Sequence, residues 1–231
     1  MQYGWKIVLL IFQAVLFMNN ERGIILVGGG GHCKSVIEVA ESCGAQISGI
    51  LDISLAVGQT ILGYPVLGND ELISSLVQKY CFLVTVGQIK NAVIRKLLHQ
   101  KIKELNGCLA TLVASSAIVS NYATIGEGSV IMHHALVNAD AKVGTGCIIN
   151  SFANIEHDVV LGDYCHVSTG AIVNGNCFIQ NETFIGSQAV IANGVTITNN
   201  SIISAGAFVR RNIAQKGIYA GNPAKLLNKV Y

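Results

Sequence analysis

The sequence predicts a Rossmann-like α/β N-terminal domain followed by an all-β parallel β-helix. The β-helix is indicated by a period of six, because every sixth residue across positions 113–209 is aliphatic. Two residues before each aliphatic position stands a small or β-branched residue, such as Ala123, Cys147 or Ala171. This period fits neither an amphipathic helix nor a hairpin meander. We interpret the aliphatic residue as filling the corner of a prism, with the small residue pointing into the same narrow interior.

The chain before the repeat alternates predicted strands and helices, which is typical of a parallel sheet with helices on both faces. The predicted strands are 24–27, 47–51, 82–86 and 108–113, and the predicted helices are 35–42, 70–80 and 91–105. Because the period begins sharply, we expect a domain boundary near residues 106–113. The predicted parts are residues 23–110, residues 111–209 and a C-terminal tail, residues 210–231.

Residues 1–22 form an N-terminal extension with an apolar run at 5–18. A signal peptide is disfavoured because no small-x-small cleavage site follows the run. We favour the hypothesis that Met18 is the natural start and that residues 1–17 are not native, with a weak membrane-surface anchor as the alternative. Mass spectrometry of the protein expressed from its native locus would decide this.

Composition excludes several classes of function. The formal net charge is +2 and no basic stripe is present, which disfavours nucleic acid as a partner. No uninterrupted apolar segment reaches the length of a membrane-spanning helix, so we expect no stable membrane insertion. Seven cysteines without a C-x-x-C motif indicate a reducing compartment, the cytoplasm, and not a disulfide framework. Cys147 and Cys165 are eighteen residues apart, and we expect them to stack as small core thiols.

A glycine run at residues 28–31, followed by His32, joins the first predicted strand to the first helix. Such a loop lets backbone N–H groups approach a phosphate closely. The full dinucleotide fingerprint is absent, because Cys33 stands where the third glycine belongs. Nucleotide binding and a merely tight turn both remain open from this motif. Asp52 ends the second predicted strand, where ribose or a base is usually bound.

Four features together resemble the NeuD/PglD family of bacterial sugar acetyltransferases: residues 28–32 (GGGGH), the hexapeptide repeat, residues 154–158 (NIEHD) and residues 221–225 (GNPAK). The resemblance covers residue 23 to the C-terminus. It implies that the β-helix is left-handed, that the chain forms a homotrimer, and that acetyl-CoA is the co-substrate without any metal. It also implies an acceptor that is a nucleotide-linked amino sugar or a nonulosonic acid of the sialic type.

The resemblance assigns roles to individual residues. His157 matches the general base and Asp158 its acidic neighbour. The residues implied to bind the cofactor are His166, Ser187 and Ala205, and the residues implied to hold the acceptor are Gly30, Gly31, His32, Asp52, Ile53 and Gly87. Ile53 departs from the pattern, because some members carry a second acidic residue there. Basic residues near the C-terminus, Lys225 among them, either meet CoA phosphates or are solvated charges.

Acetyl transfer from a thioester requires a base that is neutral near pH 7, and histidine meets that condition. His157 lies two residues after Ile155 and outside the inward register, so it does not fill the core. The alternative is a solvated surface histidine. Gly175 lies eighteen residues further on, one predicted coil away, and its N–H could stabilise the oxyanion. We expect N-acetylation of a 4-amino sugar, with O-acetylation of a sialic- or legionaminic-type acid as the alternative.

Two alternative hypotheses belong to other classes of protein. His133 and His134 suggest a metal pair like that of γ-class carbonic anhydrases, but the H-x-x-x-x-H pattern and the third histidine are missing. His99, on a predicted helix, is expected to be solvated. A noncatalytic scaffold is the remaining alternative, and it predicts no affinity for CoA.

Overall fold

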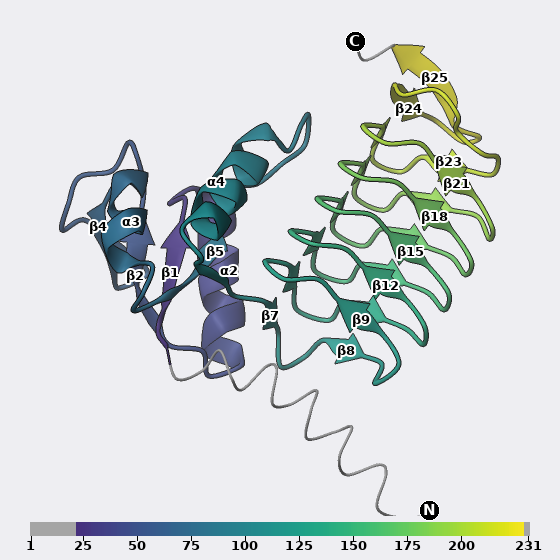
Figure 1. Ribbon diagram of the computed structural model, residues 1–231. Coiled ribbons are helices and arrows are strands. Elements are labelled where there is room, and N and C mark those ends of the chain that lie inside the picture. Colours follow the sequence, from purple (N-terminus) through teal and green to yellow (C-terminus); the bar gives the residue numbers. More distant parts are fainter. Residues whose placement is uncertain (1–21, 229–231) are drawn as a thin grey trace, which may run out of the picture.

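The structure is a computed structural model that describes residues 22–228. Figure 1 shows two bodies side by side, an α/β domain and a stack of β coils. The chain passes between them at residues 110–111, between strands β6 and β7. Our expectations for residues 1–17 fall outside the described residues.

The α/β domain contains a six-stranded sheet in the order β3-β4-β2-β1-β5-β6. Its strands are β1 (Ile24–Val27), β2 (Ile47–Leu51), β3 (Thr60–Ile61), β4 (Tyr64–Gly68), β5 (Cys81–Val84) and β6 (Cys108–Leu109). All pairs are parallel except β3 with β4. Strand β1 is central, and the chain continues first to one side of it and then to the other. The predicted Rossmann-like arrangement is confirmed.

Helices cover both faces of this sheet. Helix α2 (Gly31–Ser42) packs on one face, and η1 (Asp70–Leu72), α3 (Ile73–Leu76) and α4 (Val93–Glu104) belong to the other. Helix α2 begins at Gly31 instead of Ser35, so Gly31 and His32 lie in its first turn and not in a loop. Its start therefore brings backbone N–H groups to the carboxyl end of β1.

The hairpin of β3 and β4 was not predicted. Its turn residues Leu62 and Gly63 both have positive φ, 47° and 90°. Such a turn usually carries Asn-Gly or Asp-Gly, and leucine gives no comparable signal. The predicted strand 108–113 is also divided, because β6 joins the sheet whereas β7 (Leu112–Val113) begins the β-helix.

The β-helix is built from two-residue parallel strands that form three sheets. The first contains β7, β10 (Val130–Ile131), β13 (Ile148–Ile149), β16 (His166–Val167), β19 (Phe184–Ile185) and β22 (Ile202–Ile203). The second contains β8 (Ile118–Val119), β11 (Leu136–Val137), β14 (Asn154–Ile155), β17 (Ile172–Val173), β20 (Val190–Ile191) and β23 (Phe208–Val209). The third contains β9 (Thr124–Ile125), β12 (Lys142–Val143), β15 (Val160–Leu161), β18 (Phe178–Ile179) and β21 (Thr196–Ile197). Partners are eighteen residues apart, as in Ile131↔Ile149.

The interior follows the predicted register. Each aliphatic residue is the second residue of its strand, and from Ile131 onward all of them are buried together with the small residue two positions earlier. Cys147 and Cys165 are buried and free, as expected for core thiols. Their Sγ atoms donate to the carbonyls of Gly162 and Gln180, 3.2 Å in each case. The thiols therefore satisfy part of the interior polar surface.

Two kinds of position occur at the corners of the β-helix, one with positive φ and one with no room for a side chain. The third residue after each aliphatic position has positive φ from Gly128 to Gly206 along the stack. The glycines that directly follow an aliphatic position do not have positive φ: Gly126, Gly144, Gly162 and Gly186. Their role is space, since a Cβ at Gly144 would lie 2.6 Å from the backbone of Gly162 in the next coil.

We therefore expect Gly144→Ala to lower the free energy of unfolding more than Gly194→Ala does. The added methyl at Gly144 meets backbone that cannot move aside, a cost of about 1–3 kcal/mol. At Gly194 nothing lies within 4 Å of the added Cβ, and only the positive φ of 71° opposes it, at a cost of about 1–2 kcal/mol. Urea unfolding of both variants measures the difference, and equal midpoints would contradict the stacking argument.

The region 210–228, which we assigned to a C-terminal tail, extends the first sheet. Strand β24 (Ile218–Ala220) pairs in parallel with β22, and β25 (Lys225–Asn228) pairs with β24 in the antiparallel sense. Ile213 also bridges Ile197. The hexapeptide period ends at Val209, so the sequence pattern gives no sign of these strands.

Cys81 and Cys108 form a disulfide in the α/β domain. They face each other directly in β5 and β6, with their Cα atoms 4.7 Å apart. This pair was not expected from the cysteine pattern, because the register of β5 against β6 comes from the fold.

Helix α4 connects the two bodies along its length. Lys96 pairs with Glu182 at 2.7 Å and Lys103 with Glu127 at 2.9 Å. His99 is buried between them, with its ring centroid 5.4 Å from that of Tyr164. Burial, aided by the charge of Arg95, lowers the pKa of His99 to about 4. The expectation that His99 is solvated was wrong, because the β-helix covers this face of α4. Within residues 22–228, no helix is long and apolar enough to cross a membrane.

Candidate active site

His157 and Asp158 lie at the corner between β14 and β15. Asp158 has φ 61°, the left-handed conformation of this corner position, which aspartate tolerates better than most residues. Nδ1 of His157 donates to Oδ2 of Asp158 at 2.8 Å. Because a carboxylate only accepts, this bond fixes the tautomer and leaves a lone pair on Nε2. Both side chains are more than half exposed.

Asp158 also changes the pKa of His157. The hydrogen bond to Asp158 raises the pKa of His157 above its ordinary value, although loss of hydration opposes this, and the charges of Asp158 and Glu156 add to the rise. A more basic imidazole takes up a proton more readily. The pair therefore has the geometry and the electrostatics of a general base with an orienting carboxylate.

Gly175 lies in the next coil directly beside this ring. A Cβ at Gly175 would be 2.6 Å from Cε1 and 2.7 Å from Nε2 of His157. In the described residues the N–H of Gly175 has no hydrogen-bond acceptor, whereas its carbonyl accepts from Gly194 at 3.0 Å. A free N–H beside a basic nitrogen suits an oxyanion donor.

A cavity of about 610 Å³ lies between the two domains. Its lining residues are Gly31, His32, Ser35, Gly87, Gln88, Ile89, Asn150, His166 and Ser168. The first six come from the carboxyl ends of β1 and β5, where the strand order reverses, and the last three come from the β-helix. Crevices at such reversal points are the usual ligand sites of open α/β sheets.

His166 projects from β16 into this cavity. Its Nδ1 donates to the carbonyl of Gln88 at 2.7 Å, and its Nε2 is buried without a hydrogen-bond partner. Burial lowers its pKa to about 4, despite the bond to Gln88, and lowers the pKa of His32 to about 3. Both imidazoles are therefore neutral at pH 7. The structure thus brings His166, which we assigned to the cofactor, together with Gly31, His32 and Gly87, which we assigned to the acceptor.

Three residues assigned to the acceptor do not line this cavity. Asp52 is bound to its own loop: Oδ2 accepts from the N–H of Gly29 at 2.6 Å and Oδ1 from the N–H of Ser54 at 2.8 Å. Partial burial would raise the pKa of Asp52, but these bonds outweigh it and lower the pKa. Ile53 is 82% exposed, and Gly30 precedes α2 as its N-cap.

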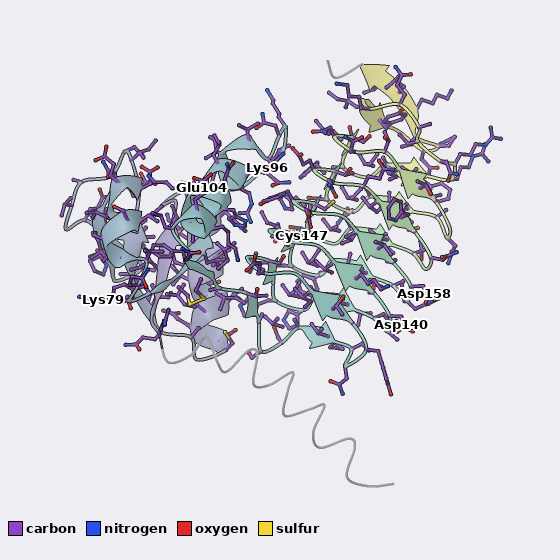
Figure 2. All side chains as sticks on the ribbon, in the orientation of Figure 1. Lys79, Lys96, Glu104, Asp140, Cys147 and Asp158 are labelled. Atoms are coloured by element: carbon purple, nitrogen blue, oxygen red, sulfur yellow. A yellow bond between two sulfur atoms is a disulfide. The ribbon has the colours of Figure 1, made fainter. Side chains whose placement is uncertain are left out.

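The assigned CoA residues Ser187 and Ala205 lie on the edge of the β-helix where the first sheet turns into the second. Ser187 Oγ is 3.0 Å from Oγ of Ser168, which lines the cavity one coil earlier. His157 and Gly175 lie instead on the edge between the second and third sheets. The assigned residues therefore occupy two different edges of one prism. Figure 2 shows Asp158 on the side of the β-helix away from the α/β domain.

Lys225 lines a second, smaller cavity of about 250 Å³ at the C-terminal end of the β-helix. Arg210 and Arg211 line it as well, together with Tyr219 and the Pro223 segment. Three basic residues around one hollow suit an anionic group such as a phosphate.

Sequence reasoning missed Gln88, Asn150 and Ser168. Gln88 follows the glycine that ends the β5 segment, a position where polar residues commonly bind ligands, so the strand pattern could have indicated it. Asn150 and Ser168 are eighteen residues apart and share an edge with Ser187. Counting back in steps of eighteen from Gly186, the residue before Ser187, reaches both Ser168 and Asn150.

His133 and His134 point to different partners. His133 Nδ1 lies 2.9 Å from Oγ of Ser116, and the ring of His134 stacks on Phe152 with centroids 4.9 Å apart. Across residues 22–228 no three His, Cys, Asp or Glu side chains gather in a way that could hold a metal ion.

Comparison with known proteins decides the family. Residues 23–102 match the PglD N-terminal domain, and residues 176–211 match the bacterial transferase hexapeptide (six repeats). The structure of PerB from Caulobacter crescentus, in complex with CoA and GDP-perosamine, is 32% identical, with a TM-score of 0.82, over 89% of this chain and 97% of that one. The chain belongs to the NeuD/PglD-like family of sugar acetyltransferases. Its fold is accordingly a Rossmann-like domain followed by a left-handed β-helix, as predicted.

Two further relatives of this family agree. The acetyltransferase domain of PglB from Neisseria gonorrhoeae FA1090, in complex with acetyl coenzyme A, is 33% identical, with a TM-score of 0.82, over 89% of this chain and 99% of that chain. UDP-N-acetylbacillosamine N-acetyltransferase of Bacillus subtilis (strain 168) is 33% identical over 115 residues. That match covers 48% of this chain and about half, 51%, of the relative. The prediction of an acetyl-CoA-dependent enzyme is confirmed at the level of the family.

Proposed function

We propose that this NeuD/PglD-like chain transfers the acetyl group of acetyl-CoA to an amino group of a nucleotide-linked amino sugar of the 4-amino type, in surface glycan biosynthesis. The proposal depends above all on the exposed His157 and Asp158 pair, whose Nε2 is free for a substrate. The relatives support the acceptor class, since one is named for a UDP-linked sugar and another was solved with GDP-perosamine.

In the proposed reaction the acceptor amine attacks the thioester carbonyl while Nε2 of His157 removes its proton. The new bond joins the amine nitrogen to the carbonyl carbon. The N–H of Gly175 donates to the oxyanion of the tetrahedral intermediate. When the intermediate collapses, the carbon–sulfur bond breaks and the proton passes from His157 to the leaving CoA sulfur. Asp158 holds the imidazole in the required tautomer throughout.

The two edges of the prism support the predicted homotrimer. His157 lies on one edge, and the cavity with Ser187 lies on another. Around a three-fold axis, the edge of one copy that carries the cavity and Ser187 faces the edge of the next copy that carries His157. An active site between subunits would therefore contain the cavity of one copy and His157 of its neighbour. Exposed apolar side chains on this β-helix, Ile118 and Phe152 among them, give such an interface its apolar surface. We place the reaction in the cytoplasm, where acetyl-CoA and nucleotide sugars are made.

The test is a panel of acceptors scored by release of CoA thiol. We expect turnover with UDP- or GDP-linked 4-amino sugars and acetyl-CoA. The same protein should release no CoA above background with free or CMP-linked nonulosonic acids. Turnover confined to the nonulosonic acids would show that the enzyme catalyses O-acetylation and not the proposed N-acetylation. No turnover in either group, together with no thermal shift by CoA, would favour a scaffold.

A further inference from the structure

Arg95 is a buried cation without a carboxylate. It lies in the first turn of α4, is 1% exposed, and is the largest fully buried side chain in the described residues. No ion pair of Arg95 is found among residues 22–228. Burial lowers its pKa to about 10, so the guanidinium remains charged at pH 7. A lone buried charge is costly, which makes its surroundings informative.

The guanidinium bonds three carbonyls that belong to both domains. One terminal nitrogen donates to the carbonyls of Val84 and Val86, 2.8 Å in each case. The other donates to the carbonyl of Gly146 in the β-helix at 3.0 Å. The planar guanidinium of arginine has N–H donors on separate nitrogens, which suits three carbonyls in different places, whereas a lysine ammonium is a compact point charge. Through these hydrogen bonds, Arg95 therefore links the carboxyl end of β5 to the β-helix.

These bonds lie directly behind one wall of the cavity. Val86 precedes Gly87 and Gln88, which line it, and the Gln88 carbonyl accepts from Nδ1 of His166 on the opposite wall. The side-chain amide of Gln88 also donates to the carbonyl of Tyr164 in the β-helix. The position of His166 therefore depends on the segment that Arg95 fixes.

The charge of Arg95 also reaches the cavity. Arg95 is close enough to lower the pKa values of both His32 and His166, after burial as the main cause for each. The N-terminus of α2, the positive end of a twelve-residue helix, reaches the cavity at Gly31. With neutral imidazoles and no carboxylate in its lining, the cavity is suited to an anion.

We propose that Arg95 is a positioning residue that holds the two walls of this cavity in register and favours the diphosphate of a nucleotide-linked acceptor. The inference rests on the proposed function, because that function supplies the nucleotide. It extends the proposed function to a residue that does not touch the substrate.

The experiment compares Arg95→Met and Arg95→Lys with Lys96→Met in the full-length protein. Lys96 is the matched control: it lies on the same helix and also links the domains, through Glu182, but at the solvent-facing side. Binding of UDP and GDP is measured by calorimetry, and KM for each substrate by CoA release. Melting curves report folding, and Arg95→Lys serves if Arg95→Met does not fold.

We expect both Arg95 variants to weaken nucleotide binding roughly tenfold or more, the scale of lost hydrogen bonds to a charged group. The KM for the acceptor should rise by a larger factor than the KM for acetyl-CoA, because the diphosphate is the group that the charge of Arg95 favours, and general destabilisation does not produce such a split. Lys96→Met should bind as the unaltered protein does. Unchanged nucleotide binding in folded Arg95 variants would overturn this inference but not the proposed function. Full nucleotide affinity in Arg95→Lys would do the same. If the unaltered protein binds neither UDP nor GDP, the proposed acceptor fails as well.

Discussion

Replacing His157 by alanine is expected to reduce turnover by about two to four orders of magnitude, the usual contribution of a general base. The KM for acetyl-CoA should change little, because the imidazole is required for proton removal. Steady-state kinetics by CoA release measures both quantities. Since the side chain is exposed, the melting temperature should be unaffected, and full retained activity would refute the role.

The pH profile gives a second measure of the same residue. A general base must be deprotonated, so kcat/KM should rise with pH through the pKa of His157, which Asp158 holds above its ordinary value. In Asp158→Asn the negative charge is lost, and the amide oxygen that can still accept from Nδ1 of His157 makes a weaker hydrogen bond without charge assistance. The inflection should therefore move to lower pH while the maximum rate falls.

Asp140→Asn is the control for that variant. Asp140 occupies the same left-handed corner position one coil before Asp158, with φ 57°, and Figure 2 shows the two side chains on the same edge. It has no histidine beside it, since Ala139 stands where His157 stands one coil later. An equal shift of the inflection in Asp140→Asn would show that surface charge alone causes it.

The repeat made the β-helix predictable because each coil obeys a local rule. One aliphatic residue and one small residue in every six define the inward register, and any polar residue outside that register must face solvent or a ligand. This register predicts His157 at an exposed corner, where the structure has it. It also explained Cys147 and Cys165 as core thiols, which they are.

The cavity was less predictable because it forms between domains. Nothing in the local pattern of α4 shows that one face packs on the β-helix, so the sequence predicts a solvated His99 and gives no signal at Arg95. Helix propensity and amphipathic spacing report only that a face is buried or exposed, not which element covers it. The strand pattern could indicate a ligand-binding position at Gln88, but not its partners His166 and Tyr164, which belong to the other domain.

Mixed trimers should recover activity from two inactive parents. His157→Ala lacks the proposed base but keeps the cavity, whereas His166→Ala keeps the base and alters the cavity. If each site joins the His157 edge of one copy to the cavity of the next, every trimer containing both subunits has one site with both intact parts. Trimers purified by two different tags should then show about one third of the activity of the unaltered protein.

The alternative arrangement gives the opposite result. If His157 and the cavity of one chain served the same site, no mixture would contain an intact site, and the activity would equal the average of the two parents. A doubly tagged trimer of two unaltered subunits controls for the tags. The separation of the two sets of residues onto different edges of the prism is the reason to expect recovery, because a single chain has the second sheet between them.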